Sequence, residues 1–439
     1  MSPAVDAPDE STEVHPVTSA GEVLARCGVL DQYSSRASGL ERVHLSAEHA
    51  LANAAAARWM RRAGLESWQD AAGNICGRRE GAEPGLPALL IGSHLDTVPD
   101  AGSFDGMLGV VMAIAVAERL GARVDAGDIA PLPFALEVIG FSDEEGTRFG
   151  TALLGSSAVA GLWDEDWWDL CDRDGTSLHA AFSAFGLEPR EVAAAARRSD
   201  DLVGYLEAHI EQGPFLEAAD RSLGYVTTIA GARRFRLSVI GEARHAGGTP
   251  YPRRRDALVG ASLAIAAIER IALAAQGGSD AIATVGRIEV APGAVNVIAG
   301  RADFSLDLRA AHDADRDAVW EQIAGEIEEI CEPRGLRFEA LETHHAPAAP
   351  CAPWLQDAVV AGVRATGDDA PMGLWSRAGH DAMAIARITD IGMLFVRCFD
   401  GISHHPGENV REIDVARGLD AFEAAVLAVA ETYRERGVR

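Results

Sequence analysis

The sequence feature that most constrains the fold is a short apolar run that ends in a polar motif. Residues 86–91 are largely apolar, and the chain then continues Gly92-Ser-His-Leu-Asp-Thr97. Such a run is typical of a buried strand in a mostly parallel sheet. His94 and Asp96 would then stand just past the carboxyl end of this strand, where α/β sheets collect their ligands. The sequence predicts an α/β protein with a polar site at one sheet edge.

A third polar residue of interest lies in a turn before a helix. Asp105 is flanked by glycines and directly precedes residues 108–120, whose apolar character predicts a helix. One imidazole and two carboxylates within a dozen residues make half of a metal site. Asp96 is placed to accept the free N–H of His94 and so to select its tautomer. A polar loop between a strand and a helix fits the same residues, so both interpretations stay open here.

A second buried strand delivers acidic residues to the same edge. Residues 134–141 are apolar and are followed by Ser142-Asp-Glu-Glu-Gly146. Adjacent Glu144 and Glu145 cannot point the same way from an extended backbone, so one can ligate a cation while the other handles protons. A solvated acidic turn is the alternative, which the buried strand immediately before it weakens. The segment that follows, 152–196, is alanine-rich and predicts mostly helix.

Two further motifs place histidines beside predicted strands. Residues 205–214 alternate apolar and polar, so that His209 shares one strand face with Glu211. A histidine in a buried strand is more often a core residue than a ligand, and only its company makes His209 a candidate. Near the C-terminus, the strand predicted at 392–396 leads to a motif with two candidates, His404 and His405, of which one need be a ligand.

The middle of the chain has a different pattern. Strands at 233–243, 283–290, 302–309 and 336–341 alternate with helices at 254–275 and 314–332, an order that resembles a ferredoxin-like unit. Because 439 residues exceed one hydrophobic core, two domains are expected: 1–225 with 346–439, and an inserted 226–345, with a hinge near Gly224 and Pro347. The insert holds His245, Asn296 and Arg309. An arginine at a strand end suits capture of a carboxylate, and a surface salt bridge fits it equally well.

Composition excludes some partners. A formal net charge of −27 argues against nucleic acid and anionic membranes, which need clustered cations, and no apolar stretch reaches membrane-spanning length. Six scattered cysteines without a Cys-x-x-Cys pair favour free thiols in a reducing cytoplasm. The first twenty residues lack the features of a signal peptide and predict a short disordered leader.

Taken together, the polar motifs describe one constellation that suits a pair of Zn²⁺ or Mn²⁺ ions: His94, Asp105, Glu145, His209 and a C-terminal histidine. The ordered phrases HLDT, SFDG, FSDEEGTRFG, HIEQGP, GEARHAGGTP, VNVI, DLR, AGHDA and GISHHP resemble the hydantoinase/carbamoylase amidase family. This family is part of the aminoacylase and carboxypeptidase clan of di-metal enzymes. The resemblance covers roughly residues 67–408.

The resemblance implies a fold and a metal centre. The fold is a di-metal aminopeptidase-like mixed sheet flanked by helices, with an inserted ferredoxin-like α+β domain that serves as lid and dimerisation domain. His94 and His209 would each hold one of two divalent ions, Asp105 would bridge them, and Glu145 and His404 would complete the set. The family phrase Gly-Ile-Ser-His-x-Pro selects His404 over His405.

The resemblance also implies an activity on small ureido carboxylates. Glu144 would be the general base, and Asp96 would orient its neighbours. Substrate-binding positions match Gln212, Asn296, Arg309, Gly379 and His380, while His245 would reach the active site of the partner in a homodimer. The expected reaction is hydrolysis of the carbon–nitrogen bond of a carbamoyl or ureido group, as in N-carbamoyl-L-amino acids or allantoate.

Two alternatives and two departures accompany this interpretation. An N-acyl amino acid deacylase or di-metal peptidase is disfavoured because peptidase relatives place an aspartate where this chain has His209. A non-catalytic binding homologue is disfavoured by the intact Glu144.

The chain departs from the family phrases at Gly248, which removes a hydroxyl near His245, and at Arg377, which with Trp375 adds bulk and charge close to the expected substrate pocket.

Overall fold

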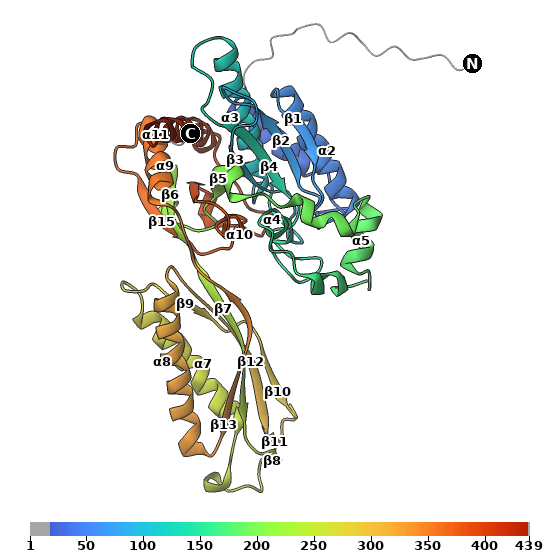
Figure 1. The fold of residues 1–439 in the computed structure, drawn as a ribbon. Coiled ribbons are helices and arrows are strands. Elements are labelled where there is room, and N and C mark those ends of the chain that lie inside the picture. Colours follow the sequence, from blue (N-terminus) through green and yellow to red (C-terminus); the bar gives the residue numbers. More distant parts are fainter. Residues whose placement is uncertain (1–17, 438–439) are drawn as a thin grey trace, which may run out of the picture.

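A computed structural model describes residues 18–437, so the expected leader lies almost wholly outside the described residues. The chain forms two bodies, each built on one sheet (Figure 1). The first sheet has nine strands in the order β1-β2-β4-β3-β5-β16-β6-β14, with β15 beside β6. Their bounds are β1 Glu66–Gln69, β2 Ile75–Arg79, β3 Ala88–His94, β4 Ala135–Phe141, β5 Leu202–Ile210, β6 Leu223–Ile229, β14 Ala349–Pro350, β15 Met372–Ser376 and β16 Ile391–Val396.

The first sheet is mixed and covered by helices on both faces. Its four central strands, β4, β3, β5 and β16, run parallel, while β2 and β6 run antiparallel to their central neighbours. One face packs against α1 Ala20–Leu30, α2 Ala47–Arg62, α3 Met107–Asp125, α9 Pro353–Ala365 and α11 Glu412–Glu435. The other face packs against the short helices α4 Leu154–Val159 and α10 Ala382–Ile385. The predicted α/β fold with a mixed sheet flanked by helices is confirmed.

The alanine-rich segment 152–196 is less helical than predicted. Besides α4 it contains one further α-helix, α5 Leu178–Phe185, and short 3₁₀ turns. Gly161, Gly175 and Gly186 all have positive φ, a conformation that a continuing helix does not allow. The segment instead folds as a small satellite core, in which Trp163 and Trp168 pack against Phe182 and Trp167 packs against Trp163.

The second sheet is antiparallel and has helices on one face only. Its strands are β7 Gly231–Ile240, β9 Ile282–Thr284, β10 Ile288–Ala291, β12 Arg301–Ala310 and β13 Arg337–Ala346. Helices α7 Ala257–Ala274 and α8 Asp313–Cys331 pack on it. The single strand expected at 283–290 is two strands, because β9 and β10 pair with opposite ends of β12. Among the described residues, α7 is the one helix with the length and composition of a membrane span.

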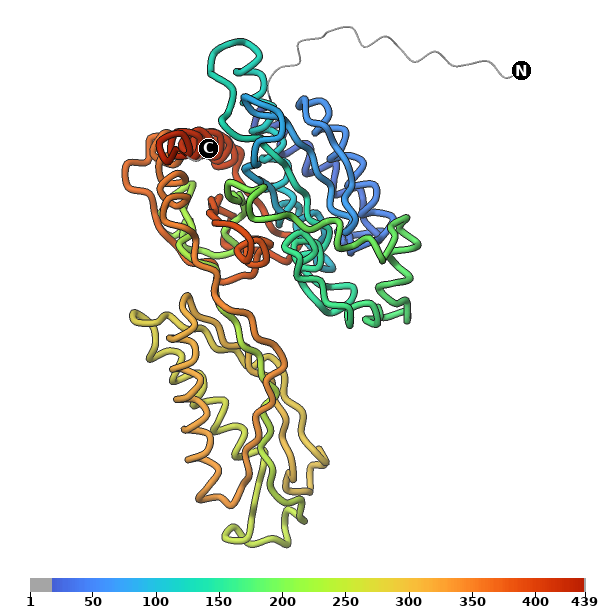
Figure 2. Tube along the Cα trace, viewed as in Figure 1, coloured from blue at the N-terminus to red at the C-terminus, as the bar shows by residue number. Residues whose placement is uncertain are grey.

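The chain crosses between the two bodies twice, at adjacent points. Only Ala230 separates β6 from β7, and only Pro347 and Ala348 separate β13 from β14. The strands pair on both sides of the crossing, β6 with β14 in the first sheet and β7 with β13 in the second (Figure 2). Gly224, expected near the hinge, lies inside β6 opposite Phe395, so the crossing is at Ala230 instead.

Candidate metal centre and active site

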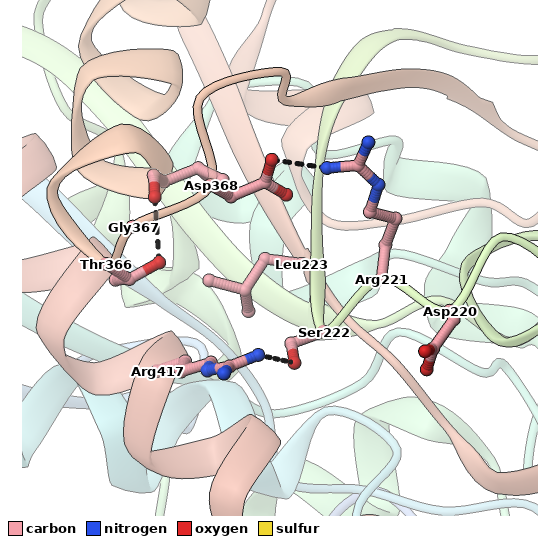
Figure 3. A pocket seen from close by; sticks show the side chains of 9 residues that line it. Asp220, Arg221, Ser222, Leu223, Thr366, Gly367, Asp368 and Arg417 are labelled. Atoms are coloured by element: carbon pink, nitrogen blue, oxygen red, sulfur yellow. Dashed lines mark hydrogen bonds and ion pairs between the residues drawn. The ribbon is translucent and has the colours of Figure 1, made fainter.

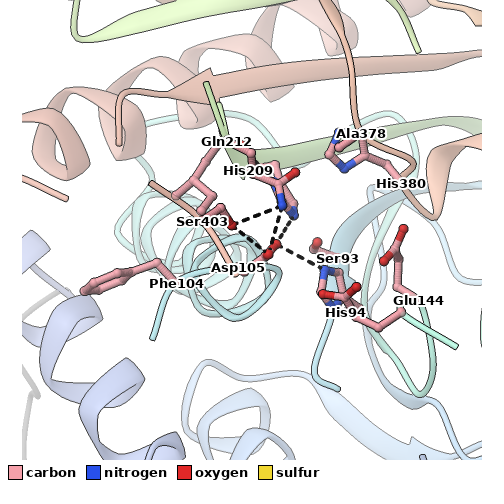
Figure 4. A network of polar contacts seen from close by, with 12 residues as sticks. Ser93, His94, Phe104, Asp105, Glu144, His209, Gln212, Ala378, His380 and Ser403 are labelled. Carbon is pink, nitrogen blue, oxygen red and sulfur yellow. Dashed lines mark hydrogen bonds and ion pairs between the residues drawn. The ribbon is translucent and has the colours of Figure 1, made fainter. Parts of the chain in front are cut away.

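Four neighbouring parallel strands bring the predicted polar residues to one sheet edge. His94 is the last residue of β3, Glu144 and Glu145 follow β4, and His209 lies near the end of β5. His404 follows β16, the next strand in the sheet. Because parallel strands end on the same side, residues more than three hundred positions apart in sequence meet around Asp105 at the start of α3 (Figure 4).

Asp105 is the centre of this cluster. Its Oδ1 lies 3.2 Å from Nε2 of His209 and 3.7 Å from Nε2 of His94. Its Oδ2 lies 3.1 Å from Nε2 of His404, which is also 3.4 Å from Oε1 of Glu145. The ligand atoms of His94, Asp105 and His209 lie within 4.8 Å of one another, as do those of Asp105, Glu145 and His404. Two possible cation sites therefore share one aspartate.

The donor set and its orientation fit two divalent ions. Nδ1 of His209 is held by the carbonyl of Ile210 at 2.9 Å, and Nδ1 of His94 by the carbonyl of Asp96 at 3.1 Å. Both Nε2 atoms are thereby turned toward Asp105. Within the described part of the chain, the buried Nε2 of His209 makes no hydrogen bond, as expected of an atom that serves as a metal ligand. Imidazole and carboxylate donors suit Zn²⁺ and Mn²⁺.

The charges of the cluster perturb its carboxyl groups. Burial raises the pKa of Asp105, but the contacts with His209, His404 and His94 outweigh burial and hold that pKa well below its usual range. Desolvation and the charge of Glu145 raise the pKa of Glu144 well above its usual value. Desolvation and Asp105 likewise raise the pKa of Glu145 to about 7. Glu144, whose carboxyl holds a proton readily beside the candidate metal pair, is suited to proton transfer.

Asp96 fixes the two elements that flank the cluster. Its carboxylate is fully buried and accepts the backbone N–H groups of Glu144 at 2.9 Å and Glu145 at 3.1 Å. The same carboxylate lies 3.4 Å from Nδ1 of His94. Asp96 thus orients the His94 ring and the Glu144–Glu145 turn together, as a carboxylate behind a ligating histidine does.

Two residues that sequence reasoning missed support Asp105. Buried Glu408 accepts the backbone N–H groups of Phe104 at 2.8 Å and Asp105 at 3.1 Å. Ser403 Oγ lies 3.0 Å from Asp105 Oδ2 and 2.9 Å from Glu408 Oε2. Glu408 ends the motif that contains His404, but nothing in its spacing indicates a contact with residues some three hundred positions earlier.

Three predicted substrate-binding residues lie in the first body beside the cluster. The amide of Gln212 donates to Asp105 Oδ2 at 2.8 Å. Gly379 lies so close to Glu144 that an added Cβ would be 3.6 Å from its Oε1. His380 is buried, with Nε2 2.7 Å from Ser376 Oγ and its ring centroid 4.5 Å from that of His209. Neighbouring His405 turns away from Asp105 and accepts the backbone N–H of Gly407, so His404 is the histidine at the cluster.

The other three predicted residues belong to the second body and do not join the cluster within one chain. His245 lies in the short strand β8 Arg244–His245, and exposed Asn296 directly precedes its partner β11 Val297–Ile298. Both lie at the far end of the second body (Figure 1). Arg309 lies near the crossing, but its guanidinium is already paired with Asp307 at 2.7 and 3.1 Å.

A separate surface pocket contains none of these residues. It is lined at the start of β6 and the end of α9 by an Arg221–Asp368 ion pair and by Arg417, which donates to Ser222 Oγ at 2.8 Å (Figure 3). Because Arg221 is paired with Asp368 and Arg417 with Ser222, neither side chain indicates a particular ligand.

The fold and the shared-aspartate cluster define the chain as an α/β protein with a candidate di-metal site. The chain belongs to Peptidase family M20/M25/M40, whose model matches residues 90–428. It is 39% identical to an N-carbamoyl-L-amino-acid amidohydrolase of Paenarthrobacter aurescens, over 89% of this chain and 93% of that protein. It is 37% identical to an allantoate deiminase of Arabidopsis thaliana, over 94% of this chain and 83% of that protein.

Solved structures agree with this assignment. A hydantoinase/carbamoylase family amidase from Burkholderia multivorans superposes with a TM-score of 0.83 at 29% identity, over 94% of this chain and 98% of that one. AtUAH in complex with glyoxylate gives a TM-score of 0.76 at 29% identity, over 94% and 98%. The resemblance inferred from the motifs is confirmed, and the chain is a hydrolase of carbon–nitrogen bonds.

Proposed function

We propose that the chain hydrolyses the ureido or carbamoyl group of a small carboxylate, such as an N-carbamoyl-L-amino acid or allantoate, with two divalent ions per subunit. The observation that carries this proposal is the position of Asp105, shared between one triad with His94 and His209 and another with Glu145 and His404. Relatives named for these two substrate classes support the choice of substrate.

The proposed chemistry assigns each residue one task. His94, Asp105, Glu145, His209 and His404 would hold the ions, which when bound polarise a carbonyl and lower the pKa of water from 15.7 to about 7. Glu144 takes a proton from the attacking water and returns it to the leaving nitrogen. Asp96 keeps Glu144 in place through its backbone. For an N-carbamoyl amino acid the reaction consumes one water and yields the amino acid, ammonia and CO₂.

The test is ammonia release by protein reconstituted with Zn²⁺ or Mn²⁺. N-carbamoyl-L-amino acids, N-carbamoyl-β-alanine and allantoate are compared with N-acetyl amino acids and dipeptides. Glu144→Gln should reduce kcat by at least about 10²-fold, the usual worth of a general base. Exposed Glu165→Gln is the matched control and should be unaffected. Turnover confined to N-acyl substrates would favour the deacylase alternative, and binding without turnover would favour a non-catalytic homologue.

We also propose that residues 226–345 form a lid and dimerisation domain on a catalytic domain made of 1–225 and 346–439. Support comes from α7, which carries an exposed apolar stripe outside its own core: Leu258, Val259, Leu263 and Leu273. Further support comes from His245, which is exposed and does not join the metal cluster of its own subunit. In a dimer it could complete the active site of the second copy and stabilise the oxyanion there. Asn296 and Arg309 would then contact the substrate carboxylate after closure.

Subunit complementation tests the shared site. Glu144→Gln and His245→Ala should each be inactive alone. When the two variants are mixed and reassociated, half of the dimers are mixed and each has one complete site, so about a quarter of wild-type activity should return. A mixture that stays inactive, while mixed dimers are shown to form, contradicts the role of His245 across the interface.

The compartment we propose is the cytoplasm. None of the six cysteines forms a disulfide, and five of them are buried. Free thiols of this kind are typical of proteins in a reducing environment.

A further inference from the structure

The guanidinium of Arg377 packs against two aromatic rings. Its guanidinium carbon lies 3.9 Å from the ring centroid of Phe215 and 4.2 Å from that of Trp375. Two aromatic rings thus contact the guanidinium and restrict its plane. The one hydrogen bond that its side chain makes to the described residues is a long one, from Nη1 to the carbonyl of Trp375 at 3.4 Å. The remaining N–H groups are available to a ligand.

The position of Arg377 relates it to the active site. It belongs to the segment 376–380, in which Gly379 lies against Glu144 and His380 packs on the ring of His209. Phe215 comes three residues after Gln212, whose amide contacts Asp105. Both rings that hold the guanidinium are therefore attached to segments that line the catalytic cluster.

The same segment also contacts the second body. Arg309 of β12 donates from Nη1 to the backbone carbonyl of Arg377 at 2.8 Å. Arg377 consequently lies where the wall of the active site meets the second body.

Neighbouring charges leave Arg377 without a carboxylate partner. Two acids act on the charge of Arg377, Asp280 and Glu211. Asp280 accepts the backbone N–H of Gly277 at 2.8 Å, and the two oxygens of Glu211 accept the backbone N–H groups of Phe215 at 2.7 Å and Leu216 at 2.9 Å. Within residues 18–437 no carboxylate lies within ion-pair distance of Arg377, whereas Arg309 is paired with Asp307. Arg377 is half-buried, so an anion that reaches it is partly removed from water and interacts more strongly.

We propose that Arg377 determines specificity, and that it selects ureido substrates with a second carboxylate on the side chain. A planar, pre-oriented guanidinium matches a carboxylate through two parallel hydrogen bonds. A substrate with a neutral side chain would leave the half-buried charge of Arg377 uncompensated. The substrate class is then an N-carbamoyl derivative of an acidic amino acid, or another dicarboxylic ureido acid. This inference rests on the proposed function.

The test compares two substrates of nearly equal shape, N-carbamoyl-L-glutamate and N-carbamoyl-L-glutamine, with the metal-reconstituted enzyme. The wild type should favour the glutamate by roughly 10- to 100-fold in kcat/KM, the value of charge-assisted hydrogen bonds. Arg377→Gln should remove this preference by raising KM for the glutamate derivative, with little change for the glutamine derivative. Arg377→Lys keeps the charge without the planar fork and should retain part of the preference.

Arg411→Gln is the matched control, because Arg411 also lies over an aromatic ring, that of Phe399, but is already paired with Glu217 at 2.9 Å. It should leave the ratio unchanged, and thermal unfolding of each variant reports whether it folds. Equal turnover of both substrates by the wild type, or an unchanged ratio in Arg377→Gln, overturns the role of Arg377 and leaves the proposed function intact. Failure of the wild type on every ureido compound overturns the proposed function itself.

Discussion

Gly106 determines how closely the turn before α3 approaches the His94 ring. Its φ is +74°, and an added Cβ would lie 2.4 Å from three ring atoms of His94. A side chain at this position is opposed both by the backbone conformation and by the ring. The absence of a side chain therefore lets Asp105 and His94 face the same candidate ion.

Gly106→Ala should displace His94 and reduce metal binding at the first triad. Gly127→Ala is the control, since Gly127 also has a positive φ of +78° but has nothing within 4 Å of an added Cβ. Both variants should lose about 1 kcal/mol of unfolding free energy from backbone strain. Only Gly106→Ala should also lose bound metal, measured by elemental analysis after dialysis. Equal metal content in the two variants would show that the contact with His94 is unimportant.

Two buried histidines behind the site make stability depend on pH. Burial lowers the pKa of His44 to about 4, and burial together with His44 lowers the pKa of His49 to about 3. In the unfolded chain both have a pKa near 6.5, so below this value the unfolded state takes up protons that the folded state refuses. Their contribution is complete above pH 6.5 and decreases as the pH falls.

Between pH 7 and pH 5, each of these histidines should reduce the free energy of unfolding by about 2 kcal/mol. His49→Gln can still accept the backbone N–H of Leu45, as Nδ1 of His49 does at 3.0 Å, and should weaken the pH dependence. His179→Gln, at an exposed position, is the control and should preserve it. Urea unfolding at the two pH values measures this change in the free energy of unfolding. If the change is the same in His49→Gln as in the wild type, the assignment to His49 is refuted.

Among the secondary-structure elements, α11 is attached to the sheet by a buried ion pair. Arg397, directly after β16, donates to both oxygens of Asp414 in the first turn of α11, each at 2.9 Å. Asp414 is fully buried, so its removal leaves the buried Arg397 with only the exposed Asp220, at 3.0 Å, as a carboxylate partner. The pair holds the end of β16 from which the chain continues to His404.

Asp414→Ala should lower the free energy of unfolding by about 3 kcal/mol or more, the usual cost of breaking a buried pair from one side. The control is Asp420→Ala on the same helix, where a pair with Arg119 at 2.8 Å involves a side chain that is 65% exposed. That change should cost less than about 1 kcal/mol. Denaturant unfolding of both variants gives the comparison, and similar losses would show that burial of the pair is unimportant.

The elements that carry the site could be predicted because each motif joins a local pattern to a sheet edge. His94 and His209 belong to predicted strands and Glu144 follows one, and parallel strands place their carboxyl ends together. Arg309 shows the limit of this reasoning: its position on β12 was predicted, but its pairing with Asp307 depends on which side chains share a strand face. Glu408 could not be found, because its contacts with Phe104 and Asp105 exist only after the chain has folded.

In the whole molecule, the second body touches the catalytic edge through Arg309 near the crossing, while His245 and Asn296 lie at the opposite end (Figure 1). A single chain thus separates residues that the proposed reaction needs together. The exposed stripe on α7 offers the surface through which a second copy could supply them.

Val259→Asp combined with Leu263→Asp should disrupt the proposed dimer, because two charges would be buried in an apolar interface. Sedimentation should show half the wild-type mass, and activity should disappear with the partner's contribution. Ile413→Asp, at an exposed apolar position on α11, is the control and should change neither. A fully active monomer would contradict the shared site.

The double crossing between the bodies also has a consequence for the order in which the chain folds. If the pairing of Ile229 with Ala349 formed first, it would close a loop of about 120 residues at a large entropic cost. Once β7 and β13 have paired up to Ala232 and Ala346, the same contact spans only a few residues. The first sheet, moreover, needs β16, which is synthesised after the whole insertion. We expect the enclosed body to be native while the enclosing one is still incomplete, so that the catalytic edge is the last part of the protein to assemble.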